Sequence, residues 1–481
     1  MGRQTMADAL WTKDELLAAI EGEVVGTLPR AITGISIDTR TIAPGELFFA
    51  IKGERTDGHD YVEQAFAAGA GLAIVGRDFR GDAAGPFIRV EDTLEALNAL
   101  GRAGRDRSTA RIIAVTGSVG KTGTKEMLRL MLGRLGATHA SDKSYNNHWG
   151  VPLSLARLPR SAAYAVFEIG MNHSGEITPL TGMVRPHAAI ITTVAPVHMA
   201  YFRDVEEIAE AKAEIFKGLE PGGTAILNRD NPYYLLLAER ARQNGAGRIV
   251  GFSQSADSGA ESRLLSLEAS AAGSRIEADI LGETVRYRLG APGGHLAANS
   301  LAALTGVKAL GGDVAQAAAA LGEFDAPQGR GAQSLHRISD GSICLIDESY
   351  NANPASMAAA FGVLAAVGQG RRIAALGDML ELGGTSVDLH RGLAEPIAAA
   401  RIDLVFSCGP DMRALHEALP EDRRGVWAPD SASLKAALFE ALKAGDTIMI
   451  KGSLGSRMGL IVEALKQTFP PLTGEGKAAA G

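Results

Sequence analysis

The sequence has few cysteines, few aromatic residues and no long hydrophobic run. Its 481 residues include two cysteines, Cys344 and Cys408, with neither a CxxC spacing nor enough thiols for a disulfide framework. No stretch of about 18 consecutive apolar residues could span a bilayer, and the first residues lack the apolar core of a signal peptide. We therefore expect a cytoplasmic protein that does not insert into membranes.

Long basic runs are also missing. Lys and Arg number 48 against 55 Asp and Glu, a net charge of -7, whereas nucleic-acid binders usually carry basic stretches interleaved with aromatic residues. We therefore expect no nucleic-acid partner. With 46% hydrophobic and 21% charged residues the chain can bury several cores, and its length predicts about three domains.

Polar, glycine-punctuated stretches divide the chain into three segments. GRAGRDRST closes the first, residues 1–108, and GEFDAPQGRGAQ separates the second, 109–328, from the third, 329–481. The first segment contains predicted helices and strands typical of a small α/β unit, at 13–20, 45–53, 61–68 and 71–76. The Pro/Gly-rich end of the third segment predicts a mobile tail from about residue 469.

The second and third segments alternate strand-like runs with helical stretches, which predicts mainly parallel sheets covered by helices. The predicted strands are 111–116, 164–169, 188–194 and 224–228 in the second segment, and 342–348, 372–377, 403–409 and 446–452 in the third. Near the end of the second segment, alternating apolar residues over 276–289 predict an antiparallel hairpin added to the parallel core.

The strongest chemical signal is TGSVGKT (116–122), a glycine-rich turn between a strand-like run and a helix. Backbone N–H groups at such a turn converge on a phosphate, and the helix dipole favours the same negative charge. Gly117 and Gly120 allow close approach of the backbone, Lys121 would neutralise phosphates, and the Thr122 hydroxyl would hold Mg²⁺. The competing interpretation is a tight turn with an exposed lysine.

Three more candidates lie in the second segment. Glu168 ends the run YAVFE, where an unpaired acid is costly unless a cation compensates it; a surface or helix-capping glutamate is the alternative. His198 follows AAIITTVAP at the sheet edge where open α/β sheets bind ligands, although a packed or solvent-facing histidine fits equally well. Lys212 lies in a charged helix whose pattern by itself favours a solvated face.

In the third segment, IDESYNANPASM (346–357) places Asp347 and Glu348 at a strand end, before an asparagine-rich turn and a helix. Such a turn can cap the helix and hold a ribose, and ordinary Asx-turn chemistry is the alternative. GDMLELG (377–383) and KGSLGSR (451–457) also follow strands and point to the same sheet edge.

Taken in order, these segments resemble the Mur ligases from about residue 30 to about residue 460. The resemblance implies an α/β protein of three domains: a small α/β UDP-sugar-binding domain, a central P-loop ATP-binding domain with a parallel sheet and added hairpin, and a C-terminal Rossmann-like ligase domain. It also implies ATP and two Mg²⁺ ions as cofactors, one ion bound through a carbamylated Lys212, which reverses the solvated-face interpretation.

The resemblance assigns further residues. It implies catalytic roles for Lys121, Glu168, His198 and Lys212, and metal ligation by Thr122, Glu168, His198 and Lys212. It implies nucleotide contacts from Gly117, Ser118, Gly120, Lys121, Thr122, Asn299, Arg330, Asp347, Tyr350 and Asn351. It implies substrate contacts from Ser36, Asp38, Arg40, Asn146 and Asn147.

The YNANP segment narrows the resemblance to the family member that joins D-alanyl-D-alanine to UDP-N-acetylmuramoyl-tripeptide through an acyl phosphate, in the synthesis of peptidoglycan precursors. We expect these two substrates and a monomer. Another Mur-type amino-acid ligase and a folylpolyglutamate-synthetase-like ligase are the enzyme alternatives. A nucleotide-dependent switch is the alternative from another class, and turnover distinguishes it.

Overall fold

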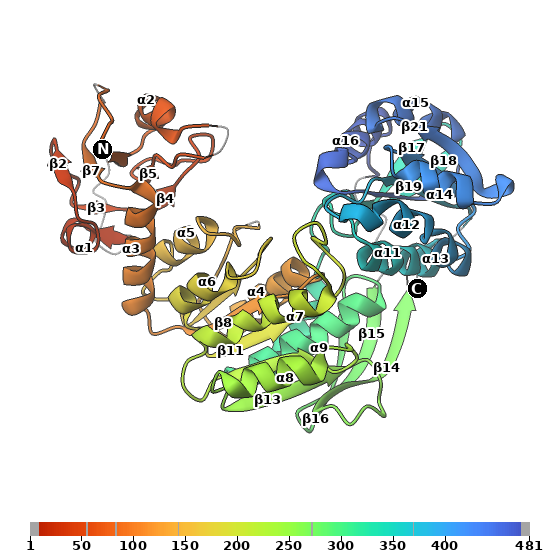
Figure 1. Ribbon diagram of the computed structural model, residues 1–481, viewed down its shortest axis with the longest axis horizontal. Helices are drawn as coiled ribbons and strands as arrows, with labels where there is room; N and C mark the ends of the chain where they lie inside the picture. Colours follow the sequence, from red (N-terminus) through yellow and green to blue (C-terminus); the bar gives the residue numbers. More distant parts are fainter. Residues whose placement is uncertain are drawn as a thin grey trace.

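The computed structural model describes residues 9–53, 56–81, 84–142, 144–270, 273–368 and 370–472. They form an N-terminal, a central and a C-terminal lobe, and Figure 1 shows the two outer lobes on opposite sides of the central one. Among the described residues, no helix combines the length and apolar character that crossing a membrane requires.

The N-terminal lobe (9–106) holds a five-stranded sheet in the order β2-β7-β6-β5-β4, in which β2 alone runs antiparallel to its neighbour. Thr12 and Glu15 form a capping box at the start of α1, and the Asp92 side chain caps α3. The elements are β1 (Trp11–Thr12), α1 (Lys13–Ala19), β2 (Glu23–Val25), β3 (Ala31–Ile32), β4 (Ile35–Ser36), β5 (Leu47–Phe49), η2 (Gly58–Tyr61), α2 (Val62–Ala67), β6 (Leu72–Gly76), β7 (Phe87–Val90) and α3 (Thr93–Asp106).

The central lobe (111–323) is built on a nine-stranded sheet in the order β16-β15-β14-β13-β12-β11-β8-β10-β9. Helices α4, α9 and α10 pack on one face of the sheet and α5 to α8 on the other. The elements are β8 (Arg111–Thr116), α4 (Lys121–Leu135), β9 (Thr138–Ala140), α5 (Gly150–Ala156), β10 (Tyr164–Glu168), α6 (Ile177–Val184), β11 (Ala188–Ile191), α7 (Val205–Ala213), η3 (Glu214–Gly218), β12 (Thr224–Asn228), α8 (Tyr234–Gln243), β13 (Arg248–Ser253), β14 (Ser262–Ser270), β15 (Gly273–Ile280), β16 (Glu283–Leu289), α9 (Gly294–Ala309), α10 (Val314–Ala320) and η4 (Leu321–Glu323).

The predicted hairpin is present as β15 and β16, joined at Leu281 and Gly282, which both have positive φ values, 54° and 86°. The antiparallel part of the sheet is larger than predicted, because β14 pairs antiparallel with β15 and parallel with β13. Half of β14 is exposed, so its sequence lacks the apolar alternation that identified the hairpin.

The C-terminal lobe (332–468) contains a six-stranded sheet in the order β17-β18-β22-β19-β20-β21, parallel except for β17. Helices cover both of its faces. The elements are β17 (Ala332–Ile338), β18 (Gly341–Glu348), α11 (Pro354–Val367), β19 (Arg372–Gly377), η5 (Gly383–Thr385), α12 (Ser386–Arg391), α13 (Ala394–Ala399), β20 (Leu404–Cys408), α14 (Met412–Ala418), η6 (Glu421–Arg423), β21 (Arg424–Ala428), α15 (Ser431–Ala441), β22 (Thr447–Lys451), η7 (Leu454–Ser456) and α16 (Gly459–Thr468).

The end of the described chain differs from the predicted mobile tail. Residues 469–472 lie along β17, where the N–H of Arg337 donates to the carbonyl of Pro470 and the N–H of Leu472 donates to that of Leu335. Backbone pairing therefore fixes the first part of the tail. The remainder of that prediction, 473–481, lies outside the described residues.

Candidate functional site

The glycine-rich turn follows β8, which lies between β11 and β10 in the sheet. Its backbone is fixed to the segment after β11, because the Ser118 hydroxyl bonds to both the N–H and the carbonyl of Ala195, each at 3.0 Å. Gly120 has φ 90°, and a Cβ there would lie 2.7 Å from the amide of Asn299. Glycine at this position therefore lets α9 approach the turn.

Lys121 begins α4 and points back over the turn. Its Nζ donates to the carbonyl of Gly117 at 2.7 Å. Burial lowers the pKa of Lys121 and nearby Arg330 adds to the effect, while Glu168 opposes it. The amine is thus held by a weak neutral acceptor, which an incoming phosphate can replace.

Glu168 ends β10, and its carboxylate is buried beside the turn, with 1% of the residue exposed. Thr122 Oγ1 donates to Oε2 at 2.9 Å, and Asn146 Nδ2 donates to Oε1 at 2.7 Å. The Thr122 and Glu168 oxygens that the sequence assigned to Mg²⁺ therefore lie next to each other.

His198 and Lys212 also lie close to Lys121. Residue 198 has φ 56°, and His198 Nδ1 lies 2.5 Å from Oε2 of Glu381. Burial lowers the pKa of His198, the contact with Glu381 opposes that shift, and the charges of Lys121 and Lys212 add to it. The three basic side chains therefore form one cluster.

Lys212 is 2% exposed, so the solvated-face interpretation of its helix is wrong. In the described part of the chain it forms neither an ion pair nor a side-chain hydrogen bond. Burial and nearby Lys121 lower the pKa of Lys212 well below its usual value. This shift favours the uncharged amine, the form that reacts with electrophiles.

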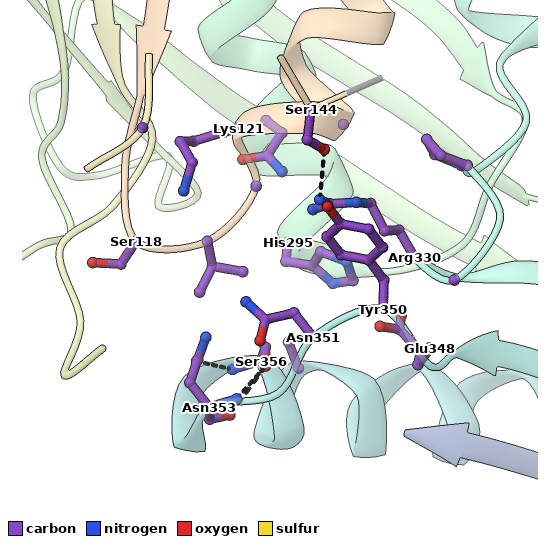
Figure 2. A pocket seen from close by; sticks show the side chains of 18 of the residues that line it. Ser118, Lys121, Ser144, His295, Arg330, Glu348, Tyr350, Asn351, Asn353 and Ser356 are labelled. Atoms are coloured by element: carbon purple, nitrogen blue, oxygen red, sulfur yellow. Dashed lines mark hydrogen bonds between the residues drawn. The ribbon is translucent and has the colours of Figure 1, made fainter. Parts of the chain in front are cut away.

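A cavity of about 280 Å³ lies between the central and C-terminal lobes, and three helices begin at its wall. Lys121 in α4, His295 in α9 and Ser356 in α11 line it from the first turns of their helices. Figure 2 shows the loop bearing Ser118 and Lys121 opposite α11. Helix N-termini favour negative charge, so this cavity suits a polyanion.

The C-terminal lobe contributes the opposite wall. The guanidinium of Arg330 lies 4.0 Å from the centre of the Tyr350 ring and donates to Ser144 Oγ in the central lobe at 3.2 Å (Figure 2). Lys451, at the end of β22, donates to Glu348 Oε2 at 3.1 Å and to the carbonyl of Asn351 at 2.9 Å. Charged groups at the ends of β18 and β22 thus reach the same cavity.

Some predicted site residues line the cavity and others lie behind it. Those that line it are Ser118, Gly120, Lys121, Asn146, Glu168, His198, Asn299, Arg330, Tyr350 and Asn351. Gly117, Thr122 and Lys212 are adjacent to these residues but outside the lining. Asp347 is buried and accepts hydrogen bonds from the backbone and hydroxyl of Ser349. The Asn147 side chain accepts from the N–H of Gly150 at the start of α5.

Ser36, Asp38 and Arg40 lie in the N-terminal lobe, away from this cavity. Arg40 pairs with Asp38 at 2.6 Å, and the Ser36 hydroxyl donates to the carbonyl of residue 38. Their loop borders a second cavity of about 550 Å³, lined by Thr33, Thr41, Tyr145 and Arg157 among others.

The segment 144–149 borders both cavities. Tyr145 lines the cavity beside the N-terminal lobe, and its neighbours Ser144 and Asn146 line the cavity beside the C-terminal lobe. A ligand long enough to follow this segment would reach both.

The donor groups fit one Mg²⁺ site directly. Mg²⁺ usually takes one or two carboxylates and completes its shell with substrate phosphates and water, and Thr122 with Glu168 provides such a partial set. The described residues contain no cluster of three or more His, Cys, Asp or Glu that could hold a metal alone. At a second site, His198 and Lys212 fit a cation only if the lysine carries a carbamate.

Sequence reasoning missed Glu381, His295 and Lys451 as site residues. His295 and Lys451 line the cavity, and Glu381 contacts His198. The available signals were the segments GDMLELG and KGSLGSR, which follow parallel strands, and GGHLAAN, which begins a helix.

The chain matches three Mur ligase domains in order. Residues 31–105 match the family described as Mur ligase family, catalytic domain; residues 115–307 match the Mur ligase middle domain; and residues 335–454 match the Mur ligase, glutamate ligase domain. The chain is 35% identical to UDP-N-acetylmuramoyl-tripeptide--D-alanyl-D-alanine ligase of Escherichia coli strain K12, over 95% of this chain and 98% of that protein.

Solved structures agree with these matches. The crystal structure of MurF from Acinetobacter baumannii aligns with a TM-score of 0.82 at 30% identity, covering 95% of this chain and 99% of that one. MurF ligase from Thermotoga maritima in complex with ADP has a TM-score of 0.74 at 24% identity, covering 90% and 97% of the two chains, and supports the fold.

Proposed function

The chain belongs to the Mur ligase family, and from this premise we propose that it is the ATP-dependent ligase that joins D-alanyl-D-alanine to UDP-N-acetylmuramoyl-tripeptide. The observation that carries the proposal is the cavity between the central and C-terminal lobes. The phosphate-binding turn, the buried Glu168 and the strand ends of the C-terminal lobe all meet there. The activity belongs to the synthesis of peptidoglycan precursors.

The reaction must activate a carboxylate, because a carboxylate does not form an amide with an amine in neutral water. The terminal carboxylate of the tripeptide attacks the γ-phosphorus of ATP, and ADP leaves. The amine of D-alanyl-D-alanine then attacks the acyl carbon and loses a proton. The bond between the acyl carbon and the phosphate oxygen breaks, and inorganic phosphate leaves. Positioning and charge stabilisation supply most of the catalysis in such a phosphoryl transfer.

The chain's own groups prepare the phosphates for this transfer. Lys121 exchanges the carbonyl of Gly117 for the phosphates, and the backbone N–H groups of the turn face the same charge. Ser118 keeps the turn fixed during the transfer through its two bonds to Ala195. Two Mg²⁺ ions, one at Thr122 and Glu168 and one at His198 and Lys212, would screen the repulsion between carboxylate and triphosphate.

Lys212 serves the second site as a carbamate. An uncharged amine attacks carbon dioxide and loses a proton, and the resulting carbamate carries two oxygen donors, so the lowered pKa of Lys212 favours the modification. Its burial beside Lys121 suits the negative charge that the carbamate would bring.

The nucleotide spans the two lobes. Asn299 lies near the adenine, Arg330 contacts phosphate, and Asp347, Tyr350 and Asn351 lie beside the ribose and base. The position of four of these side chains in the cavity wall supports this arrangement, while the buried Asp347 acts through the turn that it shares with Ser349.

The acceptor follows the segment 144–149 from the second cavity to the first. Ser36, Asp38 and Arg40 bind its uridine diphosphate, and Asn146 and Asn147 direct its peptide. This path brings the peptide carboxylate to the phosphate turn, because Asn146 also contacts Glu168.

We place the domain boundaries between residues 108 and 109 and between 328 and 329, in a cytoplasmic monomer. At the second boundary, Gly329 and Gly331 flank Arg330 with φ values of 73° and 105°, a conformation that glycine adopts without strain. Closure about this boundary would exclude water from the acyl phosphate.

The test is phosphate release with ATP and Mg²⁺ across UDP-muramoyl-tripeptides whose third residue is meso-diaminopimelate or L-lysine, each with and without D-alanyl-D-alanine. We expect release only when acceptor and dipeptide are both present, with a product whose mass is the sum of the two minus water. Phosphate release that needs neither substrate would overturn the proposal and favour a nucleotide-dependent switch.

A further inference from the structure

His198 and Glu381 meet across the junction between the central and C-terminal lobes. His198 lines the cavity, and Glu381 belongs to the loop that follows β19. His198 Nδ1 lies 2.5 Å from Glu381 Oε2, and the N–H of Ala200 donates to the backbone carbonyl of Glu381 at 3.0 Å. These two bonds fix both the side chain and the backbone of Glu381 against the segment 198–200.

The backbone at both partners is unusual. His198 has φ 56° and Glu381 has φ 63°, values in the left-handed region that residues with a β-carbon rarely adopt. Such conformations persist only where the surrounding structure imposes them, and they are concentrated at functional sites. Here two residues with left-handed backbone conformations, on different lobes, contact each other. This indicates that the fold specifically maintains the contact between them.

The contact also determines how the histidine is presented. A carboxylate beside Nδ1 favours the tautomer with the proton on that nitrogen, which leaves Nε2 with a free lone pair. Metal-binding histidines almost always have such a partner, because it fixes both the tautomer and the ring orientation. The partner here comes from a different lobe than the histidine.

We propose that Glu381 is a positioning residue: the C-terminal lobe supplies the carboxylate that orients His198 and directs its Nε2 to a divalent cation. This inference rests on the proposed function and goes beyond it. It makes the second cation site complete only when the C-terminal lobe has docked, so docking and cation binding become one event. Chemistry is then withheld until both walls of the cavity are in place.

The test compares Glu381→Ala and Glu381→Gln with Glu395→Gln, which changes an exposed glutamate on the same lobe that has no ion pair in the described part of the chain. Mn²⁺ binding is measured by calorimetry in the presence of a non-hydrolysable ATP analogue. We expect Glu381→Ala to bind the second Mn²⁺ about tenfold to a hundredfold more weakly, with the first ion unaffected. Glu381→Gln should be intermediate and Glu395→Gln unchanged.

A second measurement uses NMR to determine the tautomer of the His198 ring directly. In protein labelled with ¹⁵N-histidine, the ring signals that disappear in His198→Ala belong to His198. We expect them to report a protonated Nδ1 in the wild-type protein and to shift in Glu381→Ala.

Unchanged Mn²⁺ affinity and unchanged ring signals in Glu381→Ala would overturn the proposal, even if that variant were thermally less stable, since the contact would then only hold the lobes together. Amide formation by the wild-type protein is assayed separately. Its absence would refute the proposed function without bearing on the metal and tautomer measurements.

Discussion

The central lobe meets its two neighbours in different ways. Towards the N-terminal lobe, Leu153 and Ala156 of α5 are part of the same hydrophobic cluster as Trp11, Leu97 and Leu100. Towards the C-terminal lobe, no hydrophobic cluster of the described residues is shared. One junction is part of a core, and the other consists of the walls of a cavity.

Backbone contacts and hydrogen bonds also join the N-terminal and central lobes at the first junction. A Cβ on Gly104 of α3 would lie 2.3 Å from the carbonyl of Leu155, so the two helices touch through their backbones. Trp11 Nε1 donates to the carbonyl of Ala156 at 2.8 Å, and Arg105 Nε donates to that of Val184 at 2.8 Å. Separating these lobes would expose apolar surface to water and leave buried hydrogen-bond donors without their acceptors.

Across the second junction the described residues form few hydrogen bonds: His198 with Glu381, Ala200 with Glu381, and Arg330 with Ser144. Such contacts can be exchanged for water at small cost. The comparison teaches that the acceptor-binding lobe is anchored, while the chemistry lies where the protein can open.

The largest expected effect tests whether chemistry belongs to the second junction. Lys121→Ala should lower turnover by about a hundredfold to a thousandfold, because the transferred phosphate loses its cation, while the thermal midpoint stays close to that of the wild type. Lys13→Ala, an exposed lysine of the N-terminal lobe, is the control and should retain full activity. Normal turnover in Lys121→Ala would place the reaction elsewhere.

The next effect concerns Lys212. Lys212→Met keeps most of the buried volume but cannot form a carbamate, so activity should fall by about tenfold to a hundredfold with the fold retained. Depleting carbon dioxide and bicarbonate should lower wild-type activity and leave the variant unchanged. A variant as active as the wild type would reduce Lys212 to a packing residue.

A matched pair of glycines tests the anchored junction. In isolated helices, Gly→Ala stabilises by about 0.5 to 1 kcal/mol, and Gly133→Ala in α4 should do so because nothing lies within 4 Å of its Cβ. Gly104→Ala should instead destabilise by about 1 to 3 kcal/mol, because its Cβ meets the backbone of α5. Denaturant unfolding measures both, and equal effects would show that the first junction tolerates separation.

The smallest effect is a change of shape. Addition of a non-hydrolysable ATP analogue and acceptor should reduce the radius of gyration measured by small-angle scattering, because the two walls of the cavity would close on the bound ligands. Amide exchange in α3 and α5 should not change on the same addition. Scattering curves that superimpose with and without ligands would contradict the contrast between the two junctions.

Much of the fold follows from local patterns in the sequence. The strand-like runs predicted at 111–116, 164–169 and 188–194 correspond to β8, β10 and β11, with ends shifted by at most a few residues. Because parallel strands end at one edge of a sheet, the proximity of Glu168 and His198 to the phosphate turn could also be predicted.

Other features depend on packing that the sequence does not display. The sequence of α7 is rich in charged residues, yet Lys212 is buried. It shares the face of the helix whose apolar residues pack into the core. Glu381 was missed because its partner is on another lobe, and contacts between lobes follow from their relative placement rather than from any periodicity. The β14 strand was missed because most of its residues are exposed, so its sequence carries little apolar signal.

The shared cluster at α5 has a consequence for synthesis on the ribosome. The N-terminal lobe ends at residue 106, but its core includes Leu153 and Ala156, so the first lobe cannot complete its interior until about fifty further residues have emerged. The nascent chain must therefore keep an unfinished apolar face while the phosphate turn is being translated, and the first two lobes should mature together.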